Sequence, residues 1–202
     1  MVITHHGGQC FKVTFGDLTL AFDPISKDSS LTPAKFGADI ALVSKNKAEY
    51  NGLEEASYGE KVPFAITGPG EYERSGVVVQ GFLTGGFNTI YSVGLEDMTI
   101  LHLGALSDKA LSKEAREAIG EVDILFIPVG GGEVLSSADA HALATSIEPK
   151  VIIPMHWSGI GNPKSLEAFL KEEGGADERV EKLTIKKKDA AGKDGAIIVL
   201  TP

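Results

Sequence analysis

The chain has 202 residues, of which 43% are hydrophobic and 23% are charged, a composition ordinary for a soluble globular protein with a sizeable core. Its formal net charge of −9 argues against nonspecific binding to nucleic acid or to an anionic membrane. No apolar stretch approaches the roughly 20 residues of a membrane helix, the N-terminus lacks a signal-peptide pattern, and a single cysteine suits a reducing compartment, so we expect a cytoplasmic protein.

The first half of the chain has the pattern of a strand-rich unit. Short apolar or alternating runs bounded by Gly, Asp and Pro predict strands, and Gly16-Asp17 and Glu96-Asp97 predict two tight hairpin turns. The expected strands are residues 2–5, 11–15, 18–22, 39–43, 62–66, 76–82, 88–95 and 98–103. Residues 39–43 are nearly all apolar, which is typical of a strand covered on both faces.

The second half alternates helices with buried strands. Helices are predicted at residues 112–119, 137–147 and 162–172, strands at 122–129 and 150–155, and a final hairpin of 180–186 with 196–200 across a polar turn at 188–195. No internal repeat and no linker interrupts the chain, so we expect one domain over residues 1–202. Strands first and strand–helix alternation afterwards fit an α/β sandwich of two sheets with helices outside.

Six short motifs follow predicted strands, and their order along the chain resembles the order found in a known family. They are residues 22–24 (Phe-Asp-Pro), 42–52, 68–72 (Gly-Pro-Gly-Glu-Tyr), 101–105 (Leu-His-Leu-Gly-Ala), 127–131 (Ile-Pro-Val-Gly-Gly) and 153–157 (Ile-Pro-Met-His-Trp). The set resembles the metallo-β-lactamase superfamily, most closely its small bacterial metal-dependent hydrolases, from about Val2 to Trp157. The resemblance implies an αββα four-layer sandwich and a site for two Zn or similar divalent ions.

The loop after residues 40–43 departs from that family's pattern. Where the family has His-x-His-x-Asp-His, this chain carries Lys45, Lys47, Glu49 and Tyr50. A protonated Lys has no lone pair for a metal, and two nearby cations repel a divalent ion. Of these four positions, only Glu49 keeps a side chain able to ligate a metal.

The other metal-ligand positions of the family are mostly changed as well. The connection at residues 83–87 contains no His where relatives carry one, and the bridging Asp position is Ala105. The last His position is retained as His156. We therefore predict that the two-metal site is lost and that the chain carries no metal cofactor.

Further polar residues near the strand ends have structural interpretations. His102, at a position where relatives also have His, is predicted to be a structural imidazole, and Asp23 and Glu71 are predicted to support neighbouring loops and a tight corner. Gly130-Gly131-Gly132 allows a backbone to approach a ligand.

Three functional interpretations remain open. The first is a non-catalytic protein whose site is filled by side chains, with Glu49 neutralising one Lys. The second is an anion-binding pocket, in which Lys45 and Lys47 point inward near His102 and His156, with Tyr50 and Asp23 around them. The third is a metal-dependent hydrolase of an ester, lactone or phosphate, with a site rebuilt from His156, His102 and Glu49. A homo-oligomer is compatible with all three.

Overall fold

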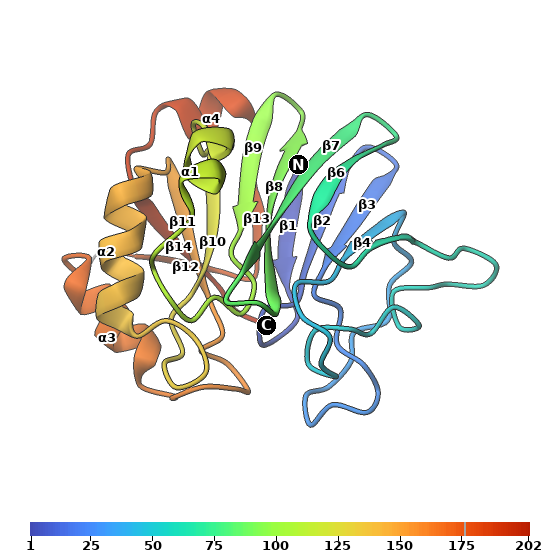
Figure 1. Ribbon diagram of the computed structural model, residues 1–202, viewed down its shortest axis with the longest axis horizontal. Coiled ribbons are helices and arrows are strands. Elements are labelled where there is room, and N and C mark those ends of the chain that lie inside the picture. Colours follow the sequence, from blue (N-terminus) through green and yellow to red (C-terminus); the bar gives the residue numbers. More distant parts are fainter. Residues whose placement is uncertain (176) are drawn as a thin grey trace.

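The computed structural model describes residues 1–175 and 177–202, and its N-terminal strands form a six-stranded mixed sheet (Figure 1). The order in this sheet is β13 (Lys182–Thr184), β1 (Val2–His5), β2 (Phe11–Phe15), β3 (Leu18–Phe22), β4 (Ile40–Leu42) and β5 (Phe64–Ile66). β1, β2 and β3 pair antiparallel, whereas β3, β4 and β5 run parallel. The polar loops after β3 and β4 therefore leave the sheet at the same edge.

The second sheet has eight strands. Its order is β12 (Glu178–Val180), β14 (Ala196–Leu200), β11 (Val151–Met155), β10 (Ile124–Pro128), β9 (Met98–His102), β8 (Asn88–Leu95), β7 (Val77–Thr84) and β6 (Gly70–Arg74). β9, β10, β11 and β14 are parallel and buried on both faces, which explains their continuous apolar sequences. On β7 only every second valine is buried, so this strand has one solvated face.

Helices α1 (Lys113–Ile119), α2 (Ser137–Ile147) and α3 (Ser165–Glu172) cover the outer face of the eight-stranded sheet. Helix α4 (Lys187–Ala191) instead packs Ala190 into the core between the two sheets. Ser112 and Ser136 cap α1 and α2, because each hydroxyl accepts a hydrogen bond from a first-turn backbone N–H at 3.1 Å. Among the described residues, no helix has the length and apolar character needed to cross a membrane.

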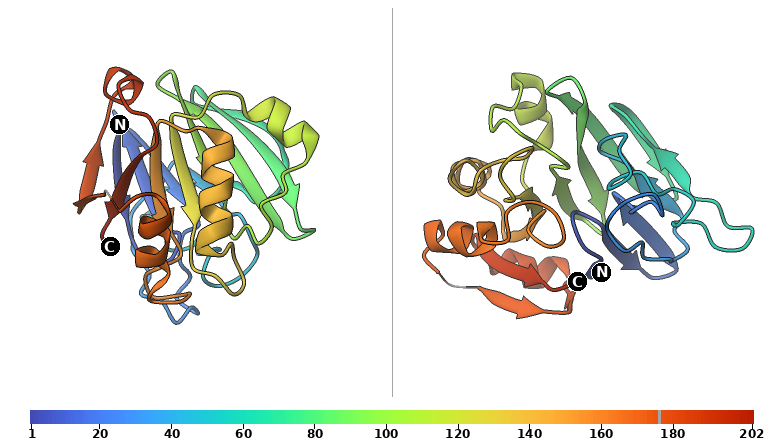
Figure 2. Two further views of the ribbon diagram at one scale, coloured as in Figure 1. Left: turned by 90° about the vertical axis from the view of Figure 1, so that its left-hand side faces the viewer. Right: turned by 90° about the horizontal axis from the view of Figure 1, so that it is seen from below.

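The main core lies between the two sheets (Figure 2). Phe11 and Phe22 from the first sheet meet Phe126 from the second, with ring centroids 4.4 and 5.8 Å apart. The outer face of the first sheet is covered instead by loop segments, where Ala38 and Ala56 pack on Ala21 and Ala41. The predicted α/β sandwich of two sheets face to face is confirmed.

One predicted element is wrong, and one strand was not predicted. Residues 70–74 form the unpredicted strand β6, which pairs antiparallel with β7 and leaves Glu71 exposed. The predicted tight corner lies just before it, where the chain bends at Gly68 and Pro69 and Gly70 has a φ of +142°. The predicted final hairpin is divided between the sheets, since β12 pairs parallel with β14 while β13 pairs antiparallel with β1. Within the predicted polar turn, residues 187–191 form α4, whose start is capped by Asp189 accepting from the Lys186 backbone N–H at 3.0 Å.

Candidate functional site

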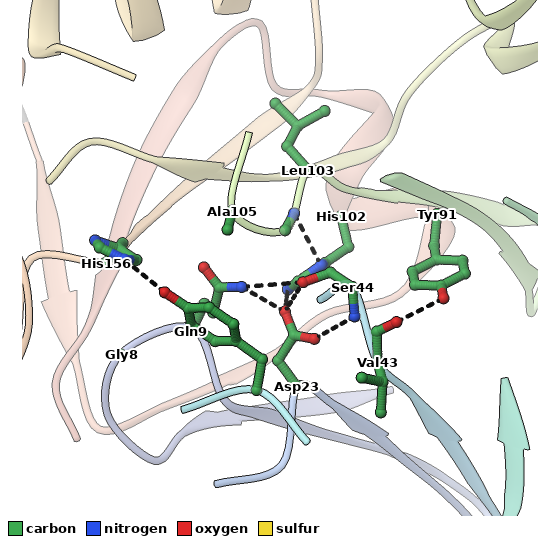
Figure 3. A network of polar contacts seen from close by, with 12 residues as sticks. Gly8, Gln9, Asp23, Val43, Ser44, Tyr91, His102, Leu103, Ala105 and His156 are labelled. Atoms are coloured by element: carbon green, nitrogen blue, oxygen red, sulfur yellow. Dashed lines mark hydrogen bonds and ion pairs between the residues drawn. The ribbon is translucent and has the colours of Figure 1, made fainter. Parts of the chain in front are cut away.

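The candidate site lies where parallel strands of both sheets end. Strands β3 and β4 lead into Asp23 and Ser44, and β9, β10 and β11 lead into loops that carry Ala105, Gly130 and His156. Figure 3 shows Gln9, from the loop between β1 and β2, reaching into the same region. This arrangement produces a buried polar network and, beside it, an open cavity.

The buried network is centred on the Asp23 carboxylate. The Ser44 backbone N–H donates to Asp23 Oδ1 at 2.6 Å, and the Ser44 hydroxyl donates to Oδ2 at 2.7 Å. Gln9 Nε2 donates to the same Oδ2 at 2.6 Å and to Ser44 Oγ at 3.1 Å (Figure 3). Gln9 and Asp23 have no solvent exposure, so these bonds join three separate segments of the six-stranded sheet inside the protein.

Burial determines the protonation of this network. Burial raises the pKa of Asp23 to about 7, although the hydrogen bonds donated by Ser44 and Gln9 oppose the shift. The predicted loop-supporting role of Asp23 agrees with these contacts, because its carboxylate joins the ends of β3 and β4.

His102 belongs to the buried network and not to the cavity wall. Its Nδ1 accepts a hydrogen bond from the Gly104 backbone N–H at 3.2 Å, so the neutral ring carries its hydrogen on Nε2. Among the described residues, this Nε2 has no hydrogen-bond partner, and it lies 3.9 Å from Asp23 Oδ2. Burial lowers the pKa of His102 to about 3, and the ring stacks on Phe22 at 5.1 Å between centroids. These contacts fit the predicted structural imidazole.

His156 is joined to Tyr50 at the end of β11. The Tyr50 hydroxyl and His156 Nε2 are 3.1 Å apart, and both side chains are at least 95% buried. Burial lowers the pKa of His156 to about 4 and raises that of Tyr50, so the pair is neutral near pH 7. Tyr50 also packs in a small apolar cluster with Ala105 and Val134. Tyr50 and Ala105, which stand at two positions that carry metal ligands in the resembling family, thus pack together in an apolar cluster here.

A cavity of about 410 Å³ opens beside this pair. Its wall consists of Lys47, Glu49 and Tyr50 from the β4 loop, residues 130–133 after β10, and His156, Ile160, Gly161 and Asn162 after β11. A Cβ at Gly130 or Gly161 would overlap the His156 carbonyl oxygen, so glycine at both positions allows the wall to close on His156.

The two lysines of the loop have different partners. Lys47 Nζ pairs with Glu133 Oε2 at 2.7 Å, and not with Glu49. Lys45 Nζ lies over the ring of Phe87 at 4.4 Å from its centroid. Burial, and secondarily the positive charge of Lys47, lower the pKa of Lys45. The expected ion pair of a lysine with Glu49 is therefore replaced by one with Glu133.

The seven residues that were predicted to form one pocket thus lie in three different places. Lys47, Glu49, Tyr50 and His156 line the cavity, Asp23 and His102 form the buried network, and Lys45 lies over Phe87. Gln9, Ser44 and Glu133 also belong to the site, and their sequence positions did not predict it. The Gly130-Gly131-Gly132 run next to Glu133 was the available signal, and it lines the cavity.

The donor set does not fit the family's two-metal centre. Within residues 1–175 and 177–202, no three His, Cys, Asp or Glu side chains converge so that they could hold a metal ion. His156 Nε2 is hydrogen-bonded to Tyr50, whereas His156 Nδ1 is buried and has no hydrogen-bond partner among the described residues. The Ser44 hydroxyl donates to the buried Asp23, and burial raises the pKa of Cys10 to about 12, so the Cys10 thiol is not activated as a nucleophile.

A family model and two relatives match this chain, and all three indicate the same family. A model of the β-lactamase superfamily domain matches residues 2–156. A UPF0173 protein from Pyrococcus abyssi is 31% identical over 193 residues, covering 85% of this chain and 90% of that protein. A UPF0173 metal-dependent hydrolase from Symbiobacterium thermophilum is 26% identical over 189 residues, covering 78% of this chain and 84% of that protein.

Solved structures agree. A Thermotoga maritima protein described as a Zn-dependent hydrolase of the metallo-β-lactamase superfamily has a TM-score of 0.75 and 25% identity, covering 98% of this chain and 97% of that one. Igni18, a metallo hydrolase from Ignicoccus hospitalis, shares the fold with a TM-score of 0.66 at 16% identity, covering 92% of this chain and 99% of that one. The sandwich, the order of the motifs at its strand ends and the family match agree, and the chain belongs to the β-lactamase superfamily.

Proposed function

We propose that this chain is a non-hydrolytic member of the superfamily, and that its cavity binds a small anion without a metal ion. The observation that carries the proposal is the hydrogen bond between Tyr50 and His156 beside Ala105. A phenol and a methyl group stand at two positions that hold metal ligands in the resembling family. The His156 imidazole, which lines the cavity, shares its Nε2 with that phenol.

The charges around the cavity support an anion as the ligand. A hydrolase of this fold places two divalent cations at this point, whereas here Lys47 lines the cavity and Lys45, from the same loop, lies over Phe87. An ammonium group attracts carboxylates and phosphates without a bound metal. Glu49 and Glu133 line the same cavity, so the net charge of these four side chains is zero and the expected affinity is modest.

The competing function is a metal-dependent hydrolase of an ester, lactone or phosphate, as the name of the Symbiobacterium relative suggests. It requires His156, His102 and Glu49 to converge on one ion. His102 is fully buried, its Nδ1 accepts from Gly104, and its Nε2 faces Asp23 and not the cavity. The geometry therefore favours the metal-free function.

Metal content separates the two functions. Protein purified without chelator would be analysed for Zn, Mn and Fe, then titrated with Zn²⁺ and Mn²⁺ by calorimetry, with His156→Ala and His141→Ala as matched variants. His141 lies on α2, where its Nδ1 is 2.9 Å from Glu173, away from the cavity. We expect no stoichiometric metal in any of the three proteins. Stoichiometric metal that His156→Ala removes and His141→Ala retains would refute the proposal.

Anion binding is measured separately. Isothermal titration calorimetry of oxalate and of inorganic phosphate tests this binding without a reporter side chain. We expect each anion to bind the wild-type protein with a saturable heat, and Lys47→Gln to weaken the binding. If neither anion gives a saturable heat with the wild-type protein, the chain does not bind small anions at this site.

A further inference from the structure

Glu133 forms an ion pair with Lys47, which is the only lysine among the described residues that lines the cavity. Its Oε2 lies 2.7 Å from Lys47 Nζ, a contact between residues 86 positions apart. The side chains are 68% and 41% exposed, so this ion pair lies at the solvent side of the cavity and not in the core. An exposed pair of this kind contributes little to stability, so its position suggests another role.

The loop that carries Glu133 is anchored at its ends and open in the middle. The Leu135 backbone N–H donates to Leu106 at 2.9 Å, the Gly131 N–H donates to Leu135 at 2.9 Å, and Val134 is buried. Gly131 and Gly132 have φ of +67° with no neighbouring atom within 4 Å of a Cβ. The Glu133 side chain can therefore leave Lys47 without disturbing the packed part of the loop.

We propose that Glu133 is an internal competitor for Lys47, and that a small molecule bearing a carboxylate replaces it when bound. The inference rests on the anion-binding function proposed above. The position of the Glu133 carboxylate marks where the ligand carboxylate sits, with Lys47 as its donor. Exchange of one carboxylate for another keeps Lys47 paired, so binding leaves no cation without a partner.

Glu49 provides a matched control. It lines the same cavity and carries the same charge, but it makes no hydrogen bond or ion pair with either lysine in the described part of the chain. Glu133→Gln and Glu49→Gln each remove one negative charge from the cavity. Only the first removes the competitor from Lys47.

The experiment titrates oxalate into wild type, Glu133→Gln, Glu49→Gln and Glu133→Gln/Lys47→Gln by isothermal titration calorimetry. Since exposed ion pairs contribute about 0.2–1 kcal/mol, we expect Glu133→Gln to lower the Kd for oxalate about 1.4- to 5-fold. Glu49→Gln has a smaller effect, and the double variant loses the gain. Circular dichroism confirms that every variant is folded.

The outcomes separate this inference from the function on which it rests. If wild type binds oxalate and Glu133→Gln leaves the Kd unchanged or raises it, the competitor role is wrong and anion binding stands. If Glu49→Gln lowers the Kd as much as Glu133→Gln, the effect comes from the loss of one negative charge anywhere in the cavity wall. The inference is then also refuted. If neither wild type nor Glu133→Gln binds oxalate, the anion function and the competitor role both fail.

Discussion

Replacing His156 with glutamine is expected to make the protein less sensitive to acid. His156 is 95% buried, and burial lowers its pKa from 6.5 to about 4. The unfolded chain therefore binds a proton on this ring between pH 6.5 and 4 that the folded chain does not bind, so stability falls as the pH falls through this window. From pH 7.5 to pH 5, this single ring accounts for a loss of about 2 kcal/mol in the free energy of unfolding.

The measurement is urea denaturation of wild type and His156→Gln at pH 7.5 and pH 5. The variant is expected to lose about 2 kcal/mol less than the wild type between the two pH values. Other titrating groups, including His102 and Asp23, contribute equally to both proteins and cancel in this difference. His141→Gln controls for removal of a histidine outside the cavity. Equal losses in wild type and His156→Gln would show that His156 is not held neutral by burial.

Three further changes test the network, the core and the cavity wall. Ser44→Ala removes the hydroxyl that donates to Asp23 at 2.7 Å, so we expect a loss of about 1–3 kcal/mol in urea denaturation; no measurable loss would mean that this bond does not stabilise the fold. Phe126→Ala removes a fully buried ring between the sheets and is expected to cost about 3–5 kcal/mol by the same assay, and a cost below 1 kcal/mol would contradict the described core. Gly130→Ala places a methyl against the His156 carbonyl, so we expect a lower Tm by calorimetry and a loss of about 1–3 kcal/mol; an unchanged Tm would show that the wall is not closely packed there.

Most of the fold could be predicted from local patterns. The alternation of Val77, Val78 and Val79 and the continuous apolar runs of residues 124–128 and 151–155 reflect which strand faces are buried. Burial of one or both faces is imposed on each strand residue by residue, so it is recorded in the local sequence. For the same reason, the motifs at the strand ends were sufficient to predict the family.

Pairing between distant segments could not be predicted in this way. Residues 178–184 divide between two sheets because β14 and β1 each offer a free edge, and nothing in the local pattern distinguishes one edge from the other. Residues 70–74 form an edge strand with exposed charges, which has the composition of a loop.

The candidate site shows the same division. The sequence by itself determined that Lys45, Lys47, Glu49 and Tyr50 stand where the resembling family has metal ligands, because that depends only on order along the chain. Only the tertiary structure decided that Tyr50 bonds to His156 and that Lys47 pairs with Glu133, 86 residues away. Partners of polar side chains depend on the distance between loops in three dimensions, and this distance is set by the packing of the two sheets.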